Sequence, residues 1–229
     1  MIRSAVQFAV GLVLFALLAR VFLLMGLIVP VMVAGSSMAP TLIGPHVEAA
    51  CPNCGSVTKV GTDQPLGGWV ACSSCTALLS INDAPVSAGD AIWIDRTAFV
   101  LRAPRRWELV VFQCPDDASQ LCVKRVLGLP GERVAIRNGD LFINGQHMPK
   151  LFDIDYQVRP GDGIRQTEFD RRQQCWQLGA GYFVVGDNQA VSLDSRNWPS
   201  GPDLSPKLLL GRPICRLRLS AEPEASPVP

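Results

Sequence analysis

The longest apolar run of the chain lies at its amino-terminal end. Residues 4–19 hold no charged side chain, and after Arg20 the apolar pattern resumes and continues to Pro30. The combined run is long enough for a helix that crosses a bilayer, so we predict a transmembrane anchor over residues 1–29. A cleaved signal peptide is disfavoured because the apolar span is too long and no small-residue cleavage pattern closes it. A buried core helix is the third interpretation of the same run.

Beyond residue 80 the pattern changes to short strands and turns. Residues 89–102 and 106–114 are rich in β-branched and aromatic side chains, which favour strands. Asn138 and Gly139 stand between two further strand-like runs, and this dipeptide is a strong signal for a hairpin. We therefore predict a mainly β fold.

Two segments interrupt or follow the strand pattern. Residues 153–176 are polar and charged, which predicts a surface loop. Residues 221–229 have too few apolar side chains to pack, which predicts a disordered tail. One β domain is therefore expected over residues 30–220.

Composition and charge narrow the possible functions. The 18 prolines and 20 glycines suit a turn-rich β protein. The net charge is +1, so no overall field favours nucleic acid, and we expect no nucleic-acid partner. With only four lysines and two histidines, there are few candidates for a general base.

Four cysteines form two C-x-x-C pairs. Cys51 and Cys54 are separated from Cys72 and Cys75 by seventeen residues, a spacing found in zinc ribbons. We predict a small zinc-ribbon-like module over residues 44–80 with a structural zinc, since a closed shell of four cysteine ligands leaves no open position for catalysis. Two disulfides or free thiols are the alternative, which an extracytoplasmic setting would favour.

The other four cysteines have no such pattern. Cys114 and Cys122 flank a short loop and could bridge its mouth, whereas Cys175 and Cys215 stand alone. The sequence does not decide how any of the four pair. His46 precedes the first C-x-x-C pair and is expected at the surface or beside the metal ligands rather than among them.

One lysine has the pattern expected of a buried base. A serine hydroxyl is a weak nucleophile and needs a base within hydrogen-bond reach. Neither His46 nor His147 has a supporting context. Lys124 lies in a strand-like apolar run, where alternation points it inward and Arg125 to the opposite face. Burial would lower its pKa, although a single lysine in a strand is by itself more often a solvated edge residue.

Four stretches, taken in order, resemble the sequence boxes of the type I signal peptidases, membrane-bound Ser-Lys proteases. These stretches are GSSMAPTL (35–42), RWELVVFQCP (106–115), VKRVLGLPGERV (123–134) and GDNQAVSLDSRNW (186–198). The resemblance covers most of residues 20–215 and implies a signal-peptidase-like (LexA-like) β domain. The insertion over residues 44–88, which contains the cysteine module, departs from the minimal family.

The resemblance also implies roles for individual residues. Ser37 would be the nucleophile, Lys124 its base, and Ser192 a partner that hydrogen-bonds the lysine amine. Asp194 and Arg196 would form a supporting ion pair, and catalysis would need no cofactor. The substrate pocket would be lined by five apolar side chains: Val31, Val33, Met38, Leu42 and Val123.

The oxyanion hole departs from part of that family. The backbone N–H of Ser37 would be one donor. Some members place a serine two residues before the nucleophile as the second donor, and here that position is Gly35. Ser36 is an outside candidate for the missing donor.

The expected partners and location follow from the anchor and the resemblance. Arg3 and the terminal amino group outnumber Arg20, which favours a cytoplasmic amino terminus and an extracytoplasmic body. We expect a single-pass monomer of the cytoplasmic (inner) membrane that acts on the signal peptides of exported preproteins and contacts the lipid bilayer.

Two other interpretations stay open. A related Ser-Lys maturation peptidase could serve one dedicated substrate; the self-cleaving LexA-type repressors, by contrast, lack an anchor and carry a DNA-binding domain. From another class, the chain could be an inactive membrane-anchored zinc-ribbon binding protein. The presence of all the implied site residues argues against such decay.

Overall fold

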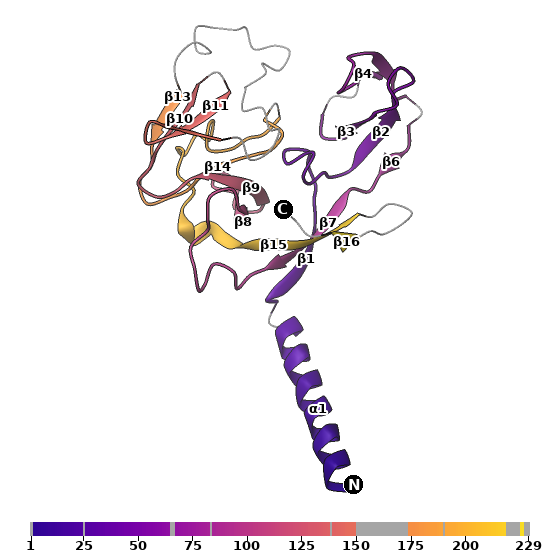
Figure 1. Ribbon diagram of the computed structural model, residues 1–229, viewed down its shortest axis with the longest axis vertical. Helices are drawn as coiled ribbons and strands as arrows, with labels where there is room; N and C mark the ends of the chain where they lie inside the picture. The colour runs from indigo at the N-terminus through magenta and orange to yellow at the C-terminus, as the bar shows by residue number, and fades with distance from the viewer. Residues whose placement is uncertain are drawn as a thin grey trace.

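A single apolar helix extends from a β-rich body in the computed structural model (Figure 1). The structure describes residues 2–24, 26–64, 67–82, 84–137, 139–149, 174–189, 191–218 and 225–226. Helix α1 spans Ile2–Leu24. Its Arg3–Phe22 part is long and apolar enough to cross a membrane, and it buries nothing against the body. Because β1 already begins at Ile28, the last two residues of the predicted anchor, 28 and 29, belong to a strand.

The largest sheet forms the centre of the body. Its strands lie in the order β1-β7-β15-β8-β9-β14, and β16 pairs with β15 outside that path. All of these pairings are antiparallel. The strand bounds are β1 (Ile28–Met32), β7 (Asp90–Asp95), β8 (Leu109–Gln113), β9 (Leu121–Gly128), β14 (Phe183–Val185), β15 (Leu209–Arg218) and β16 (Ala225–Ser226). A short 3-10 helix, η2 (Pro206–Leu208), precedes β15.

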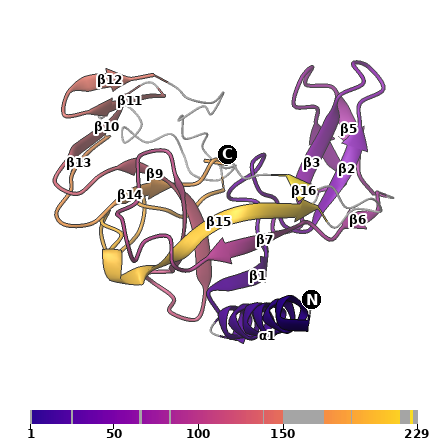
Figure 2. The same cartoon turned by 60° about the horizontal axis from the view of Figure 1, so that its bottom comes forward.

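A second sheet covers one end of the body (Figure 2). Its order is β12-β11-β10-β13, with bounds β10 (Arg133–Arg137), β11 (Asp140–Ile143), β12 (Gln146–Met148) and β13 (Gln174–Gln177). The antiparallel pairing of β10 with β11 confirms the predicted hairpin, and Gly139 takes a positive φ at its turn.

The inserted residues form a separate lobe beside the body (Figures 1 and 2). One sheet has the order β3-β2-β6, with β2 (His46–Ala50), β3 (Val57–Gly61) and β6 (Val86–Ser87). The other pairs β4 (Trp69–Ala71) with β5 (Leu78–Ser80). Because β6 pairs with β2, the lobe extends past residue 80, the expected end of the module.

Each part of the protein has its own apolar core. Between β9, β14 and the second sheet lies a cluster that includes Leu127, Val134 and Phe183. A different cluster, which includes Met38, Leu42 and Ile92, lies behind the turn after β1. The inserted lobe packs Val47, Leu79 and two of its cysteines against one another.

The mainly β fold is as predicted, but two expected irregular segments contain strands. Gln174–Gln177 forms β13 and pairs with β10, so the loop expected over 153–176 is wrong at its last three residues. Its residues 153–173 lie outside the described residues. In the tail expected to be disordered, Ala225 and Ser226 pair with β15 as β16.

Candidate active site and cysteine cluster

Ser37 lies in the turn that follows β1. The Val33 N–H donates to Asp90 O at 2.9 Å, which continues the pairing of β1 with β7 beyond the strand. The chain then turns, and a hydrogen bond of 3.0 Å from the Ala39 N–H to Ser36 O closes the turn around Ser37. The Ser37 residue is half-buried, so its hydroxyl lies at the boundary between core and solvent.

Lys124 reaches this hydroxyl from the central sheet. It lies on β9 opposite Val110 of β8, and its side chain points inward as the alternation predicts. The residue is 4% exposed, and its Nζ donates to Ser37 Oγ at 2.7 Å. Burial lowers the pKa of Lys124 below its ordinary value of 10.5, while the negative charge of Asp194 acts in the opposite direction. A buried amine with a lowered pKa beside a serine hydroxyl has the properties of a general base.

Asp194 and Arg196 form the expected ion pair. Arg196 Nε donates to Asp194 Oδ1 and Arg196 Nη2 to Asp194 Oδ2, each at 2.8 Å. Asp194 is fully buried and also accepts a hydrogen bond of 3.0 Å from the Gly186 N–H. The pair therefore ties the end of β14 to the segment around Ser192.

The hydrogen bond expected from Ser192 to the lysine amine is replaced by another. The Ser192 hydroxyl donates to Asp194 Oδ2 at 2.6 Å, and the amine donates to Ser37. A buried carboxylate is a stronger acceptor than a neutral amine, which explains why the Ser192 hydroxyl donates to Asp194 and not to Lys124. Ser192 nevertheless lies near Ser37, since a Cβ at Gly186 would fall 2.2 Å from Ser192 Oγ and 2.5 Å from the backbone oxygen of Ser37.

A buried ion pair next to Lys124 is not predicted from the sequence. Arg125 Nε and Nη2 donate to the two carboxylate oxygens of Asp187 at 2.8 and 2.7 Å, and both side chains are 2% exposed. Thr41 Oγ1 donates to the same carboxylate at 2.5 Å. The only sequence signal is that Arg125 and Asp187 each lie within a stretch that carries the resemblance.

Asn188 holds the serine turn from the β-rich body. Its N–H donates to Ser37 O at 3.0 Å, and its Nδ2 donates to Ser36 O at 3.1 Å. Ser36 is 1% exposed, and its hydroxyl donates to Asp63 Oδ2 at 3.1 Å. Since that single O–H is already used, Ser36 is a poor candidate for the missing oxyanion donor.

The five apolar residues expected to line a substrate pocket lie in one cluster. Met38 and Leu42 are buried in it, and Val31, Val33 and Val123 pack against it while partly exposed. Val31, Val33 and Val123 therefore leave some apolar surface exposed over a buried cluster that includes Met38, the residue after Ser37.

Comparison with known proteins decides the family. A family model described as signal peptidase, peptidase S26, matches residues 73–213, which is more than half of the chain. The chain belongs to this family. The matched part contains Lys124, Ser192, Asp194 and Arg196, whereas Ser37 lies before it.

Individual signal peptidases agree with the family match. A probable signal peptidase I-2 of Synechocystis is 31% identical over 157 residues, which cover 65% of this chain and 61% of that relative. Signal peptidase I of Pseudomonas fluorescens is 32% identical over 139 residues, which cover 52% of this chain and 47% of the relative. The chain thus spans about half to two thirds of the length of these curated relatives. The crystal structure of an Enterococcus faecalis signal peptidase I has 26% identity and a TM-score of 0.38, covering 48% of this chain and 97% of that one.

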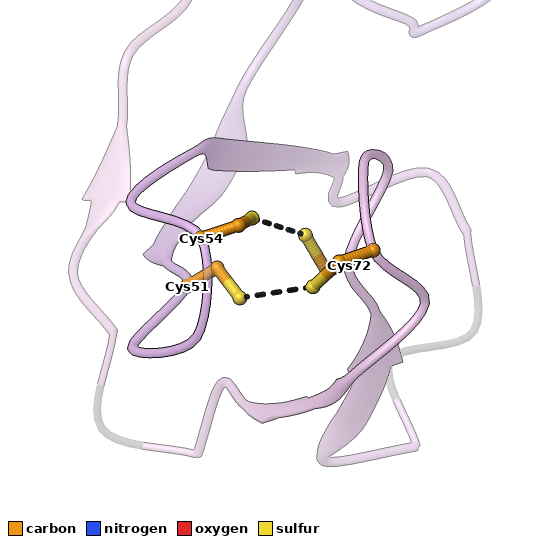
Figure 3. A group of neighbouring side chains, drawn as sticks. Cys51, Cys54 and Cys72 are labelled. Carbon is orange, nitrogen blue, oxygen red and sulfur yellow. Dashed lines mark hydrogen bonds between the residues drawn. The ribbon is translucent and has the colours of Figure 1, made fainter.

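The four C-x-x-C cysteines of this S26-family chain meet in the inserted lobe. Their four sulfur atoms all lie within 4.8 Å of one another. Figure 3 shows Cys51 and Cys54 on one loop, facing Cys72 on another. The Sγ atoms of Cys51 and Cys75 are 3.5 Å apart, and those of Cys54 and Cys72 are 3.6 Å apart. A tetrahedral zinc with Zn–S bonds of about 2.3 Å places its sulfurs about 3.8 Å apart, so the arrangement fits a metal.

The surroundings of this cluster favour thiolates at one of its two loops. Ser56 Oγ lies 3.1 Å from Cys72 Sγ, and this hydrogen bond is the main cause that lowers the pKa of Cys72 to about 5.

Each C-x-x-C pair closes a tight turn. The Thr76 N–H donates to Cys72 O at 3.0 Å, and the Gly55 N–H donates to Cys51 O at 2.9 Å. Thr76 and Gly55 both take positive φ values. At Gly55 glycine meets this requirement freely, and at the second turn threonine accepts the less favoured conformation.

The other cysteines are free thiols in the structure. Cys114 and Cys122, whose pairing the sequence leaves open, are not joined. Burial raises the pKa of Cys122 to about 12. Cys175 Sγ accepts a hydrogen bond of 2.9 Å from Arg133 Nε, and Cys215 is likewise not in a disulfide. His46 is buried rather than at the surface, and its ring contacts Gly44 O and Glu48 Oε1.

Proposed function

We propose that the protein is a membrane-anchored serine endopeptidase that removes signal peptides from exported preproteins. The observation that carries the proposal is the hydrogen bond of 2.7 Å between Lys124 Nζ and Ser37 Oγ. It joins a buried amine to a half-buried hydroxyl across 87 residues of sequence, in a chain of the S26 family.

The reaction begins with proton transfer inside this pair. Neutral Lys124 takes the proton of Ser37 Oγ as the oxygen attacks the carbonyl carbon of the scissile peptide bond. The tetrahedral intermediate collapses when the leaving amine receives that proton from Lys124, and an acyl-enzyme on Ser37 remains. Lys124 then accepts a proton from water as the water oxygen attacks the ester carbonyl, and it returns that proton to Ser37 Oγ when the second intermediate releases the carboxylate product.

The groups around the pair support both steps. No described residue accepts a hydrogen bond from the Ser37 N–H, which supports its use as an oxyanion donor. Because the Ser192 hydroxyl bonds Asp194, we assign Ser192 a positioning role through that carboxylate. Asp194 raises the pKa of Lys124 against the effect of burial, and Arg196 lowers it. The positive charge of Arg196 therefore partly cancels the effect of Asp194 on the base.

The substrate and the location follow from the apolar surface and the anchor. The partly exposed Val31, Val33 and Val123, which pack over the buried Met38 and Leu42, suit contact with a small side chain at the residue before the cut. Three residues separate the end of α1 from β1, and Ser37 follows five residues after β1. We place α1 across the cytoplasmic membrane of a single-pass monomer, with the body on the extracytoplasmic face where signal peptides emerge.

We further propose that Cys51, Cys54, Cys72 and Cys75 hold one structural zinc ion. All four ligands would come from cysteine, so the ion would have no open position for a substrate or water. Its chemistry would be to join the two loops of the lobe, whose own apolar core is small.

The experiment compares cleavage of a preprotein in detergent by the wild type and by Ser37→Ala. The wild type should release the signal peptide, and mass spectrometry of the product should locate the cut after a small residue. Replacing that small residue of the substrate by Trp should abolish the cut. Cleavage by Ser37→Ala at the wild-type rate, or an intact wild-type protein that cuts no preprotein, would contradict the proposal.

A further inference from the structure

The inserted lobe touches the turn that carries Ser37. Asp63 follows β3 of the lobe, and its Oδ2 accepts hydrogen bonds from the Ser36 N–H at 2.9 Å and from Ser36 Oγ at 3.1 Å. The neighbouring Gln64 donates from Nε2 to the same hydroxyl at 3.0 Å. The N–H and the hydroxyl of Ser36 are thus hydrogen-bonded by side chains of the inserted lobe.

The two segments approach too closely for a side chain at Gly61. A Cβ at Gly61 would fall 2.5 Å from Ser36 Cβ, and real Cβ atoms do not come so near. A Cβ at Gly35 would fall 3.2 Å from Asp63 Oδ2. This contact is tight, but the Asp63 carboxylate is the far end of a flexible side chain, so a small shift can relieve it.

The base of the lobe is held in place by the body. The Gly44 N–H donates to Gly35 O at 2.9 Å, and the Thr62 N–H donates to Pro45 O at 2.9 Å. At Gly89, a Cβ would fall 2.3 Å from the carbonyl carbon of Gly44. Asp63 is consequently attached to a segment that is itself fixed next to the serine turn.

The turn is held from two sides. Asn188 of the body donates to the carbonyl oxygens of Ser36 and Ser37, while Asp63 of the lobe accepts from the N–H and hydroxyl of Ser36. The carbonyl oxygen and the N–H of Ser36 belong to the two peptide units on either side of its Cα, so the two contacts together restrain rotation about this residue. Ser37 is the next residue, and a nucleophile displaced by about 1 Å can lose about 100-fold in rate.

We propose that Asp63 is a positioning residue for the nucleophile, through which the inserted lobe completes the active site. The inference rests on the proposed function, because it assigns Asp63 a role in the use of Ser37. Asp63 is exposed to solvent, so its loss should affect the geometry of the turn far more than the stability of the fold.

The test uses the full chain in detergent and three variants. Asp63→Ala removes the acceptor, Asp63→Asn keeps an acceptor oxygen, and Glu48→Gln changes an exposed carboxylate of the same lobe that faces Lys59. For each protein we would measure kcat and KM on a preprotein, the thermal unfolding midpoint, and hydrogen–deuterium exchange of the peptide over residues 33–42.

Asp63→Ala should lower kcat about 10- to 100-fold, with KM changed less than about twofold and a midpoint within a few degrees of the wild type. Hydrogen–deuterium exchange over residues 33–42 should become faster in Asp63→Ala. Asp63→Asn should recover most of kcat, and Glu48→Gln should match the wild type.

If Asp63→Ala shows wild-type kcat and wild-type exchange, the inference is overturned and the proposed function still stands. A fall of both kcat and the unfolding midpoint in Asp63→Ala that Asp63→Asn does not reverse would also overturn the inference. If the wild type itself cuts no preprotein, the proposed function fails, and the exchange of residues 33–42 alone decides the role of Asp63.

Discussion

At the scale of single residues, burial and the nearby charge of Asp194 have opposite effects on the protonation of the Lys124 amine. Burial favours the neutral form, and the nearby Asp194 favours the protonated one. Arg196 holds both oxygens of that carboxylate, which limits its effect on the amine. Burial is the stronger influence, so the pKa of Lys124 lies below its ordinary value.

The lowered pKa predicts a pH dependence of kcat/KM. Below the pKa of Lys124 the amine is protonated and accepts no proton from Ser37, whereas above it the base is available. We expect kcat/KM to rise with pH through this lowered pKa and then to level off, in an assay with a preprotein whose cleavage site does not titrate. A rate that is independent of pH from acid to alkaline conditions would show that another group is the base.

The same pKa direction has a consequence for stability. Between the lowered folded-state pKa and the unfolded-state pKa of about 10.4, the unfolded chain binds one more proton than the folded chain. The free energy of unfolding should therefore increase with pH across that window. Lys124→Met removes the buried amine and should lose this slope. It should also raise the unfolding midpoint at neutral pH by about 2–4 °C for each kcal/mol of relieved desolvation, whereas a lower midpoint would contradict the account.

The buried pair of Arg125 and Asp187 should be a strong contributor to stability. Asp187→Ala leaves the guanidinium of a 2%-exposed side chain without its carboxylate, and such losses amount to about 3–5 kcal/mol. Denaturant unfolding would measure the change, with the exposed Asp116→Ala as the control. A difference below about 1 kcal/mol between the two variants would contradict the role of this pair.

Some of these residues can be predicted from the sequence, and others cannot. Lys124 is indicated by strand alternation and by the scarcity of other bases. Asp63 is not, since its contact with Ser36 depends on how closely Gly61 and Ser36 approach, a distance that no local pattern encodes. Ser192 is expected to hydrogen-bond the lysine amine, but its hydroxyl donates to Asp194, because its partner depends on a competition between two buried acceptors.

At the scale of elements, the inserted lobe is a small domain with few apolar residues of its own. Its strands β4 and β5 pair only with each other among the described strands, and its core includes Cys51 and Cys72. Small cores of this kind usually need a further cross-link. The four clustered sulfur atoms can supply one if they bind a metal.

The zinc proposal predicts the metal content of the purified protein. Elemental analysis should find about one zinc per chain, and Cys54→Ser should lower it because one of four thiolate ligands is lost. Removal of the metal by a chelator should increase hydrogen–deuterium exchange in the lobe while β8 and β9 stay protected. Less than about half a zinc per chain, together with four cysteines that resist alkylation, would favour two disulfides instead.

Elements are predictable where the pattern of side chains is local. The hairpin of β10 and β11 is signalled by its Asn-Gly turn. Strand β13 reads QCWQ, which is too polar and too short to indicate a strand, and it forms because β10 offers an edge with which it can pair. Likewise, β16 depends on the neighbouring β15 rather than on its own two residues.

At the scale of the whole molecule, an apolar helix, a β-rich body and an inserted lobe lie next to one turn. Helix α1 is followed closely by β1, and the serine turn follows β1. The body contacts that turn through Lys124 and Asn188, and the lobe contacts it through Asp63. Ser37 and Lys124, the proposed catalytic pair, are thus each held by elements that lie far apart in the sequence.

The central claim is that Ser37 and Lys124 act as one catalytic unit. The most direct measurement is kcat/KM for preprotein cleavage by Ser37→Ala, Lys124→Ala and the double variant, with Lys207→Ala as an exposed-lysine control. Each single variant should lose about 1000-fold or more, and the double variant should be no slower than either, because residues that act as a unit have non-additive effects. Wild-type cleavage by either single variant, or a double variant slower by the product of the two losses, would contradict the claim.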